Sequence, residues 1–210
     1  MTRVYLVRHG ETEWNATKRA QGQADIELNL DGIQQAEKAA RDLTNVSLDA
    51  VYSSDLKRAF HTAAPIAASH GLKVQTDTDF REIDQGDWEG LSVDEIRRRW
   101  PEDWGAVRHY TARPGGESPA QVRKRALEGL ARVIERHPEG TVVIVSHGGT
   151  IRWISAEVLG FDDRRSARLR GVANGGIVSF DASLDPHGKL ELSNLRRLDG
   201  ATPDLDDPND

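Results

Sequence analysis

The chain alternates between short apolar runs and longer segments in which apolar residues recur every three or four positions. Runs of apolar and β-branched residues predict strands, at residues 3–7, 48–53, 73–76, 141–145, 171–180 and 189–197. Helical spacing, together with capping residues, predicts helices over about 31–43, 55–70, 92–100 and 119–137, with a further helix directly after His147. The helix over 55–70 is expected to begin at Asp55, because aspartate is a good N-cap residue.

Strands alternate with helices along most of the chain, and this order is typical of an α/β protein. The sequence therefore predicts a three-layer α/β/α fold with a mostly parallel central sheet, completed by the last two strands and antiparallel in part. We expect a single domain over residues 1–198. The long irregular stretch within 91–118 is typical of a lid-like insertion. Residues 199–210 are acidic, have little to bury, and are predicted to be disordered.

Composition narrows the classes of function. The 210-residue chain is 37% hydrophobic, which is enough to bury a substantial core. Its formal net charge of −6 argues against a nucleic-acid partner, because affinity for the phosphate backbone needs lysine and arginine clustered over an extended face. Any anion site must therefore be local, with a few arginines gathered in one concave place.

Compartment and partners are indicated by residues that the chain lacks. It has no cysteine, so neither a disulfide nor a thiolate metal site can form, and this weakly favours a reducing compartment. The apolar run at the start is too short for a signal peptide, and no segment approaches a membrane span. We therefore expect a cytoplasmic protein with no membrane partner.

Predicted strand ends carry side chains suited to binding a phosphate. Arg8 and His9 directly follow the first strand, and His147 follows the strand at 141–145. Arg58 falls in the first turn of the helix after the second strand, where free backbone N–H groups also favour anions. Open α/β sheets bind ligands at the carboxyl ends of their strands, so we expect these cations to meet at one edge. There an arginine would hold the anion while a histidine nitrogen attacks phosphorus.

An acidic loop after the strand at 73–76 supplies candidate proton donors, which are Glu82, Asp84, Asp87 and Glu89. A carboxyl group near a bound phosphate has its proton affinity raised by that negative charge, which suits a general acid at neutral pH. Spacing alone does not choose among the four.

Four motifs together resemble the histidine phosphatase superfamily, the phosphoglycerate mutase-like group. They are Leu-Val-Arg-His-Gly-Glu-Thr-Glu-Trp-Asn at 6–15, Ser-Ser-Asp-Leu-x-Arg-Ala at 53–59, Arg-Glu-Ile-x-x-Gly-x-Trp-Glu-Gly at 81–90 and Ser-His-Gly-Gly at 146–149. The resemblance runs from residue 3 to about residue 180. It implies the fold of that group and the hydrolysis of a small phosphorylated metabolite through a phosphohistidine.

The resemblance also implies a catalytic role for five residues. His9 would be the nucleophile and Glu82 the proton donor. The transferring phosphoryl group would be bound by Arg8, Arg58 and His147. Phosphoryl transfer depends mostly on positioning and charge stabilisation, so these fixed cations can replace a metal, and no cofactor is implied.

Further phosphate or substrate contacts follow from the same resemblance, at Asn15, Gln21, Gly22 and the backbone amide of Gly148. Gln21 stands where mutases often have threonine or serine, so its role is the least defined. Outside the motifs, Arg108, His109 and Arg113 are weaker candidates for recognising the rest of the substrate.

Three other functions compete with a phosphatase. A phosphoglycerate mutase of this kind carries a longer insertion between the acid and the second histidine, and here only 65 residues separate Glu82 from His147. A non-catalytic phospho-ligand binding module is disfavoured because all five catalytic positions are filled. A metallohydrolase is disfavoured because no HxH pair provides closely spaced ligands. The residues do not identify the phosphate ester that is hydrolysed, and we expect region 91–118 to select it. The sequence is also compatible with a homodimer.

Overall fold

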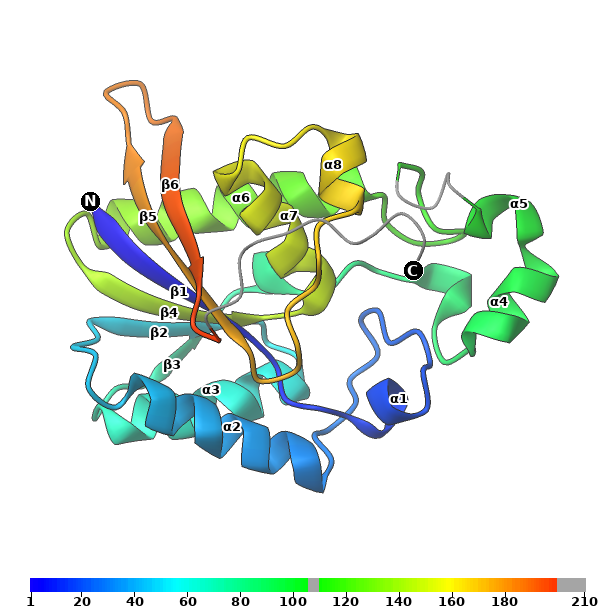
Figure 1. Ribbon diagram of the computed structural model, residues 1–210, viewed down its shortest axis with the longest axis horizontal. Helices are drawn as coiled ribbons and strands as arrows, with labels where there is room; N and C mark the ends of the chain where they lie inside the picture. Colours follow the sequence, from blue (N-terminus) through cyan, green and yellow to red (C-terminus); the bar gives the residue numbers. More distant parts are fainter. Residues whose placement is uncertain (106–109, 200–210) are drawn as a thin grey trace.

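The computed structural model describes residues 1–105 and 110–199, and its centre is a six-stranded sheet in the order β3-β2-β4-β1-β5-β6 (Figure 1). The strands are β1 (Thr2–Arg8), β2 (Ala50–Ser53), β3 (Val74–Thr76), β4 (Thr141–Ser146), β5 (Ile177–Leu184) and β6 (Leu190–Arg197). Strands β1 to β4 run parallel, whereas β5 is antiparallel to β1 and β6 to β5. The predicted mostly parallel sheet with an antiparallel part is confirmed.

Helices cover both faces of this sheet. The helices of the described residues are α1 (Glu13–Ala16), α2 (Leu30–Leu43), α3 (Lys57–Ser69), α4 (Val93–Arg99), α5 (Pro101–Trp104), α6 (Pro119–Arg136), α7 (Gly148–Val158) and α8 (Asp163–Ala167), with short 3-10 turns at Thr78–Phe80 and Gly86–Trp88. Figure 1 shows α2 and α3 on one face and α6 and α7 on the other, so the three-layer α/β/α prediction is confirmed. Within the described ranges, no helix is long and apolar enough to cross a bilayer.

Strand β4 shows why the sheet needs both helical layers. Its side chains alternate, so Val142 and Ile144 join the core under α6 and α7, while Val143 and Val145 join the core under α2 and α3. All four are fully buried, as expected for a strand with no polar face. The strand is thereby locked in register at the middle of the sheet.

Two helices begin as the capping residues predict. Ser118 and Gln121 form a reciprocal capping box at the start of α6, and Ser92 and Glu95 form one at the start of α4. The predicted cap at Asp55 is wrong. Helix α3 starts one residue after Leu56 without a side-chain cap, because the Asp55 carboxylate accepts hydrogen bonds from the Arg81 guanidinium instead.

The predicted strand at 171–180 is displaced. Strand β5 begins only at Ile177, because the glycine-rich residues before it cross the carboxyl end of β1 as a loop. Gly175 has a φ of +71°, and its N–H donates to the carbonyl of Arg8 over 3.0 Å. This loop therefore covers the strand end that carries the Arg-His motif.

Candidate active site

His9 and His147 leave the sheet side by side from two neighbouring parallel strands. The register pairs Arg8 with Ser146, and the N–H of His9 donates to the Ser146 carbonyl over 2.9 Å. Each histidine thus follows the last residue of its strand, and the two ring centroids lie 5.0 Å apart. The chain leaves β1 toward α2 on one face and β4 toward α7 on the other, so the pair stands at a topological switch point of the sheet.

The hydrogen bonding of His9 defines which ring nitrogen is free. The side chain is 3% exposed, and Nδ1 lies 2.7 Å from the carbonyl oxygen of Gly10. A neutral imidazole has one N–H, so this contact places the hydrogen on Nδ1 and leaves a lone pair on Nε2. Burial and the positive charges of Arg58 and Arg8 lower the pKa of His9 well below its ordinary value. The ring is therefore neutral at pH 7, as a nucleophile requires.

Arg58 is fully buried in the first turn of α3. Its Nη1 and Nη2 donate to the carbonyls of Ala24 and Gly22 over 2.7 and 2.8 Å, and its Nε has no hydrogen-bond partner among the described residues. Burial lowers the pKa of Arg58 to about 10 despite the opposing charge of Glu82, so the guanidinium stays positive at neutral pH.

Arg8 lies against the N-terminus of α7. Its Nη1 donates to the Val172 carbonyl over 2.7 Å, whereas its Nε is buried and has no partner in the described ranges. A Cβ placed on Gly148 would come within 3.3 Å of the Arg8 Cζ, so the helix start and the guanidinium are in close contact. Burial lowers the pKa of Arg8 as well, and the nearby Arg152 adds to that effect.

His147 is fully buried at the N-cap of α7, and neither of its ring nitrogens has a partner in the described part of the chain. Burial, with Arg58 and His9 nearby, lowers the pKa of His147 well below its ordinary value. Buried polar atoms without partners are costly, and the Nε atoms of Arg8 and Arg58 share this property. An oxyanion within reach would accept hydrogen bonds from the two arginine Nε atoms and from the one ring nitrogen of a neutral His147 that carries a hydrogen.

Glu82 is the acidic-loop residue whose carboxylate meets the start of α7. Its Oε2 accepts from the N–H of Gly149 and its Oε1 from the N–H of Ile83, each over 3.0 Å. The same carboxylate raises the pKa values of Arg8 and Arg58, which places it within electrostatic range of both guanidiniums. A Cβ on Gly149 would lie 2.4 Å from the Glu82 Oε1, so a larger residue at this position would displace the carboxylate.

The other acidic candidates make contacts elsewhere. Asp84 accepts from the N–H of Gly86 over 2.8 Å, and Glu89 accepts from the N–H of Gln23 over 2.5 Å. Asp87 lies beside Gly115. Among the four carboxylates, the geometry therefore gives Glu82 the position closest to the histidine and arginine cluster.

Besides Gly148, the resemblance implies further contacts at three residues, which have different surroundings. Asn15 forms a capping box with the N-cap residue Thr12 of α1, and its Oδ1 accepts from Thr12 and from Asn174. Gln21 is 9% exposed, and its Oε1 has no hydrogen-bond partner among the residues described. Gly22 acts through its carbonyl, which holds Arg58.

Two supporting residues were not expected from the sequence. Thr62 Oγ1 accepts from the N–H of Gly10 over 2.9 Å, and Asn174 Nδ2 donates to the carbonyl of His9 over 3.0 Å. Thr62 is, besides Arg58, the buried polar residue of the alanine-rich α3, one turn after Arg58, and that placement was a usable signal. Asn174 follows no pattern, since it lies in the loop that was predicted to be a strand.

Residues proposed for recognising the rest of the substrate are only partly placed. Arg108 and His109 lie outside the described residues. The Arg113 guanidinium lies 5.3 Å from the ring centroid of Trp88, and Trp88 in turn packs against Trp104 at 5.6 Å. Arg113 therefore stands next to the acidic loop rather than at the two histidines.

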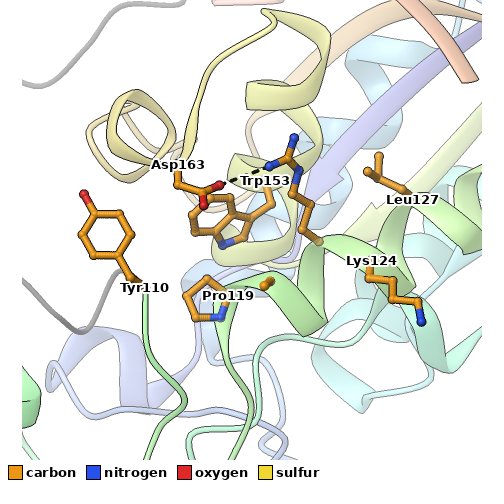
Figure 2. Close-up of a pocket in the computed structure, with 8 residues that line it drawn as sticks. Tyr110, Pro119, Lys124, Leu127, Trp153 and Asp163 are labelled. Carbon is orange, nitrogen blue, oxygen red and sulfur yellow. Dashed lines mark hydrogen bonds and ion pairs between the residues drawn. The ribbon is translucent and has the colours of Figure 1, made fainter.

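A pocket of about 300 Å³ lies between α6, α7 and α8. Figure 2 shows Tyr110, Pro119 and Trp153 along its wall, with an ion pair drawn from Asp163, whose partner is Arg123. None of the candidate site residues lines it. Across residues 1–105 and 110–199, no group of three or more histidine, aspartate or glutamate side chains is arranged to hold a metal ion.

Residues 4–194 match the model of the histidine phosphatase superfamily, branch 1. The chain belongs to this superfamily. The family, its phosphoglycerate mutase-like fold and its phosphatase branch are thereby confirmed as the motifs predict.

Relatives of this histidine phosphatase include proteins named as phosphatases. Phosphoserine phosphatase 1 of Hydrogenobacter thermophilus is 41% identical over 165 residues, which covers 77% of this chain and 78% of the relative. Glucosyl-3-phosphoglycerate phosphatase of Mycobacterium tuberculosis is 34% identical over 204 residues, covering 90% and 89%. A solved mycobacterial glucosyl-3-phosphoglycerate phosphatase in complex with VO3 superposes with a TM-score of 0.83 at 34% identity, covering 90% of this chain and 96% of that one. Phosphatases thus outweigh the mutase alternative among these relatives.

Proposed function

We propose that the protein is a metal-independent phosphomonoesterase that hydrolyses small phosphorylated metabolites through a phosphohistidine on His9. The observation that carries this proposal is the convergence of two buried imidazoles, 5.0 Å apart, with two guanidiniums whose buried Nε atoms have no partner among the described residues. A phosphoryl group is the ligand class that matches this set, because it presents several negative oxygens to several fixed donors.

In the first step, the His9 Nε2 lone pair attacks phosphorus and the bond from phosphorus to the ester oxygen breaks. The Gly10 carbonyl holds the Nδ1 hydrogen and so keeps Nε2 directed at the substrate. Arg8, Arg58 and His147 stabilise the charge on the equatorial oxygens. Glu82 donates its proton to the leaving alkoxide, so that a neutral alcohol departs.

In the second step, water replaces the alcohol. The Glu82 carboxylate, now ionised, takes a proton from that water while the water oxygen attacks the phosphorus of the phosphohistidine. The bond from phosphorus to Nε2 breaks, inorganic phosphate forms, and His9 returns to its neutral state. The same carboxyl group acts as acid and then as base, which its anchoring on the start of α7 favours.

The test is to trap the intermediate. On a phosphate ester labelled in the phosphoryl group, we expect the wild-type protein to acquire acid-labile, alkali-stable label, and His9→Asn to acquire none and to lose at least about a thousandfold in kcat/KM. A chelator present throughout should leave the wild-type rate unchanged. Normal turnover in His9→Asn would favour the non-catalytic reading of the cluster, and loss of activity in chelator would favour a metallohydrolase.

The mutase alternative predicts a different product from the same intermediate. A mutase returns the phosphoryl group to a second substrate oxygen and excludes water, whereas a phosphatase releases inorganic phosphate. With 3-phosphoglycerate as substrate, we expect phosphate release without net formation of 2-phosphoglycerate.

We propose that residues 91–118 contact the part of the substrate beyond the phosphoryl group. The placement of α4 and α5 supports this, since both lie on the side of the molecule toward which the carboxyl ends of β1 and β4 point (Figure 1). The named relatives act on phosphate esters of small carboxylic metabolites, so a panel of such esters assayed for phosphate release is the first measurement. The lack of cysteine supports a cytoplasmic location for the reaction.

A further inference from the structure

The loop that carries Glu82 is held from outside the site by an arginine on α6. Arg125 Nη1 donates to the carbonyls of Asp79 and Arg81, and Nη2 donates to the carbonyl of Glu82, over 2.7 to 2.9 Å. Its Nε and Nη2 also donate to the two carboxylate oxygens of Glu117, each over 2.9 Å. All five N–H donors of this guanidinium are therefore used, which no lysine could reproduce.

Glu117 joins the same loop to the segment that precedes α6. Its Oε2 accepts from the N–H of Asp84 over 2.9 Å, and its own N–H donates to the Asp84 carbonyl over 3.0 Å. Burial raises the pKa of Glu117, but hydrogen bonds from Arg125 and Asp84 outweigh that effect and lower it. The carboxylate is therefore ionised at neutral pH and pairs fully with Arg125.

The two backbones are packed too closely to move apart independently. The N–H of Asp87 donates to the Pro114 carbonyl over 2.8 Å. A Cβ on Gly116 would lie 2.4 Å from the Asp84 carbonyl oxygen, and one on Gly86 would lie 2.1 Å from that of Pro114. Residues 84–87 and 113–117 thus form one unit, with Arg125 and Glu117 at its base.

We infer that the Arg125–Glu117 pair positions Glu82 for proton transfer and couples that position to residues 113–117, which belong to the proposed substrate-recognition segment 91–118. The inference rests on the proposed role of Glu82 as the proton donor. Arg125 contacts the backbone of residue 82, while the Glu82 carboxylate reaches the start of α7. Arg125 is therefore a positioning residue, and its loss should move the carboxylate without removing it.

The experiment compares two kinds of leaving group. A simple alkyl phosphate such as glycerol phosphate needs a proton on its leaving oxygen, whereas p-nitrophenyl phosphate releases a stable phenolate and does not. The measured quantity is kcat/KM, because it reports the steps up to departure of the leaving group and excludes hydrolysis of the phosphohistidine. A variant that misplaces the acid should lose activity on the alkyl ester alone.

For Arg125→Ala we expect kcat/KM on the alkyl phosphate to fall about 10- to 100-fold, with a change of less than about threefold on p-nitrophenyl phosphate. Glu117→Gln keeps the shape of the side chain and should show the same selectivity with a smaller loss. The matched control is Arg132→Ala, since Arg132 lies on the same helix and pairs with Asp77 and Asp79 without touching residues 81–84. Equal losses on both esters, in folded Arg125→Ala and Glu117→Gln, would mean a purely structural role and would overturn the inference.

A double variant separates this inference from the proposed function. Glu82→Gln should show the leaving-group selectivity by itself, and adding Arg125→Ala to it should cost little more on the alkyl ester, because the acid is already absent. If Glu82→Gln shows no selectivity, the proposed acid is wrong. If Glu82→Gln shows it and Arg125→Ala does not, only the positioning role is wrong.

Discussion

Backbone carbonyls, rather than carboxylates, hold the two arginines of the site. Arg58 donates to the carbonyls of Gly22 and Ala24, and Arg8 donates to that of Val172. A carbonyl fixes the direction of a guanidinium without cancelling its full charge. The positive charge therefore stays available to a phosphoryl group, and the protein needs a rigid loop in place of an acidic partner.

Substitution of Gly22 should disturb the position of Arg58, because the Gly22 carbonyl accepts a hydrogen bond from its guanidinium. The φ of Gly22 is +54°, and an added Cβ would lie 2.1 Å from the Glu89 Oε1 and 2.8 Å from the Gln85 nitrogen. We expect Gly22→Ala to lower the free energy of unfolding by about 1–3 kcal/mol and kcat/KM by about 10- to 100-fold, because the Gly22 carbonyl that holds Arg58 would shift. Enzyme assays and urea unfolding measure the two effects.

The matched control is Gly71→Ala. Gly71 has a similar φ of +66°, but nothing lies within 4 Å of an added Cβ. It should show a cost of about 1 kcal/mol in stability from the backbone alone, with unchanged kcat/KM. Unchanged activity in Gly22→Ala would show that Arg58 does not depend on this carbonyl.

Single residues were predictable where the strand pattern fixed their place. Arg8, His9 and His147 follow directly from apolar runs that end at one sheet edge, and Arg58 follows from the start of a helix. The contact of Asp55 was not predictable in this way. An N-cap preference of about 1 kcal/mol is weaker than the charged hydrogen bonds that the Asp55 carboxylate accepts from Arg81. That partner depends on tertiary contacts, which local sequence does not contain.

At the scale of elements, α6 links the core to the acidic loop. Its buried face packs on the sheet through residues including Ala126, Leu130 and Ile134, and its Arg125 holds the residues around Glu82. Helical spacing and a capping box predicted this helix, but they did not predict that Arg125 donates hydrogen bonds to the acidic loop. Among several arginines on α6, only the fold distinguishes the one that reaches residues 79–82.

The cap of α6 should contribute measurably to stability. Ser118 accepts from the N–H of Gln121 over 3.3 Å, and the Gln121 side chain accepts from the N–H of Ser118 over 2.8 Å. We expect Ser118→Ala to lower the free energy of unfolding by about 1 kcal/mol, as a lower urea midpoint with an unchanged slope. Ser92→Ala removes the same capping box from α4, whose only buried residue is Ile96, and should shift the midpoint less. An equal shift in both would mean that α4 is as tightly coupled to the core as α6.

At the scale of the whole molecule, an acidic protein keeps a local cationic site in which both histidines are neutral. The pKa values of His9 and His147 are lowered below the ordinary value of 6.5 by burial and by neighbouring arginines. Below pH 6.5 these two histidines therefore bind protons in the unfolded chain but stay neutral in the folded chain. The contribution of the two histidines to the free energy of unfolding is therefore complete above pH 6.5, and it falls as the pH drops toward their pKa values in the folded protein.

We expect this effect in the pH dependence of unfolding. Each histidine contributes up to about 1.4 kcal/mol per pH unit within that window. The unfolding midpoint of His9→Asn should therefore fall less steeply below pH 6.5 than that of the wild type. His61→Asn, an exposed histidine on α3, should keep the wild-type slope. Identical slopes in all three proteins would show that His9 is protonated in the folded state.

The in-register pairing of β1 with β4 has a consequence for the evolution of such enzymes. Backbone geometry sets the spacing between the two imidazoles, so substitutions in distant side chains leave it alone, whereas inserting or deleting a single residue in either strand would destroy it. The spacing of the two histidines that carry out the chemical step can thus stay constant during evolution, while the segments that contact the leaving alcohol change in sequence. New substrates can thus be acquired without rebuilding the centre that breaks the ester.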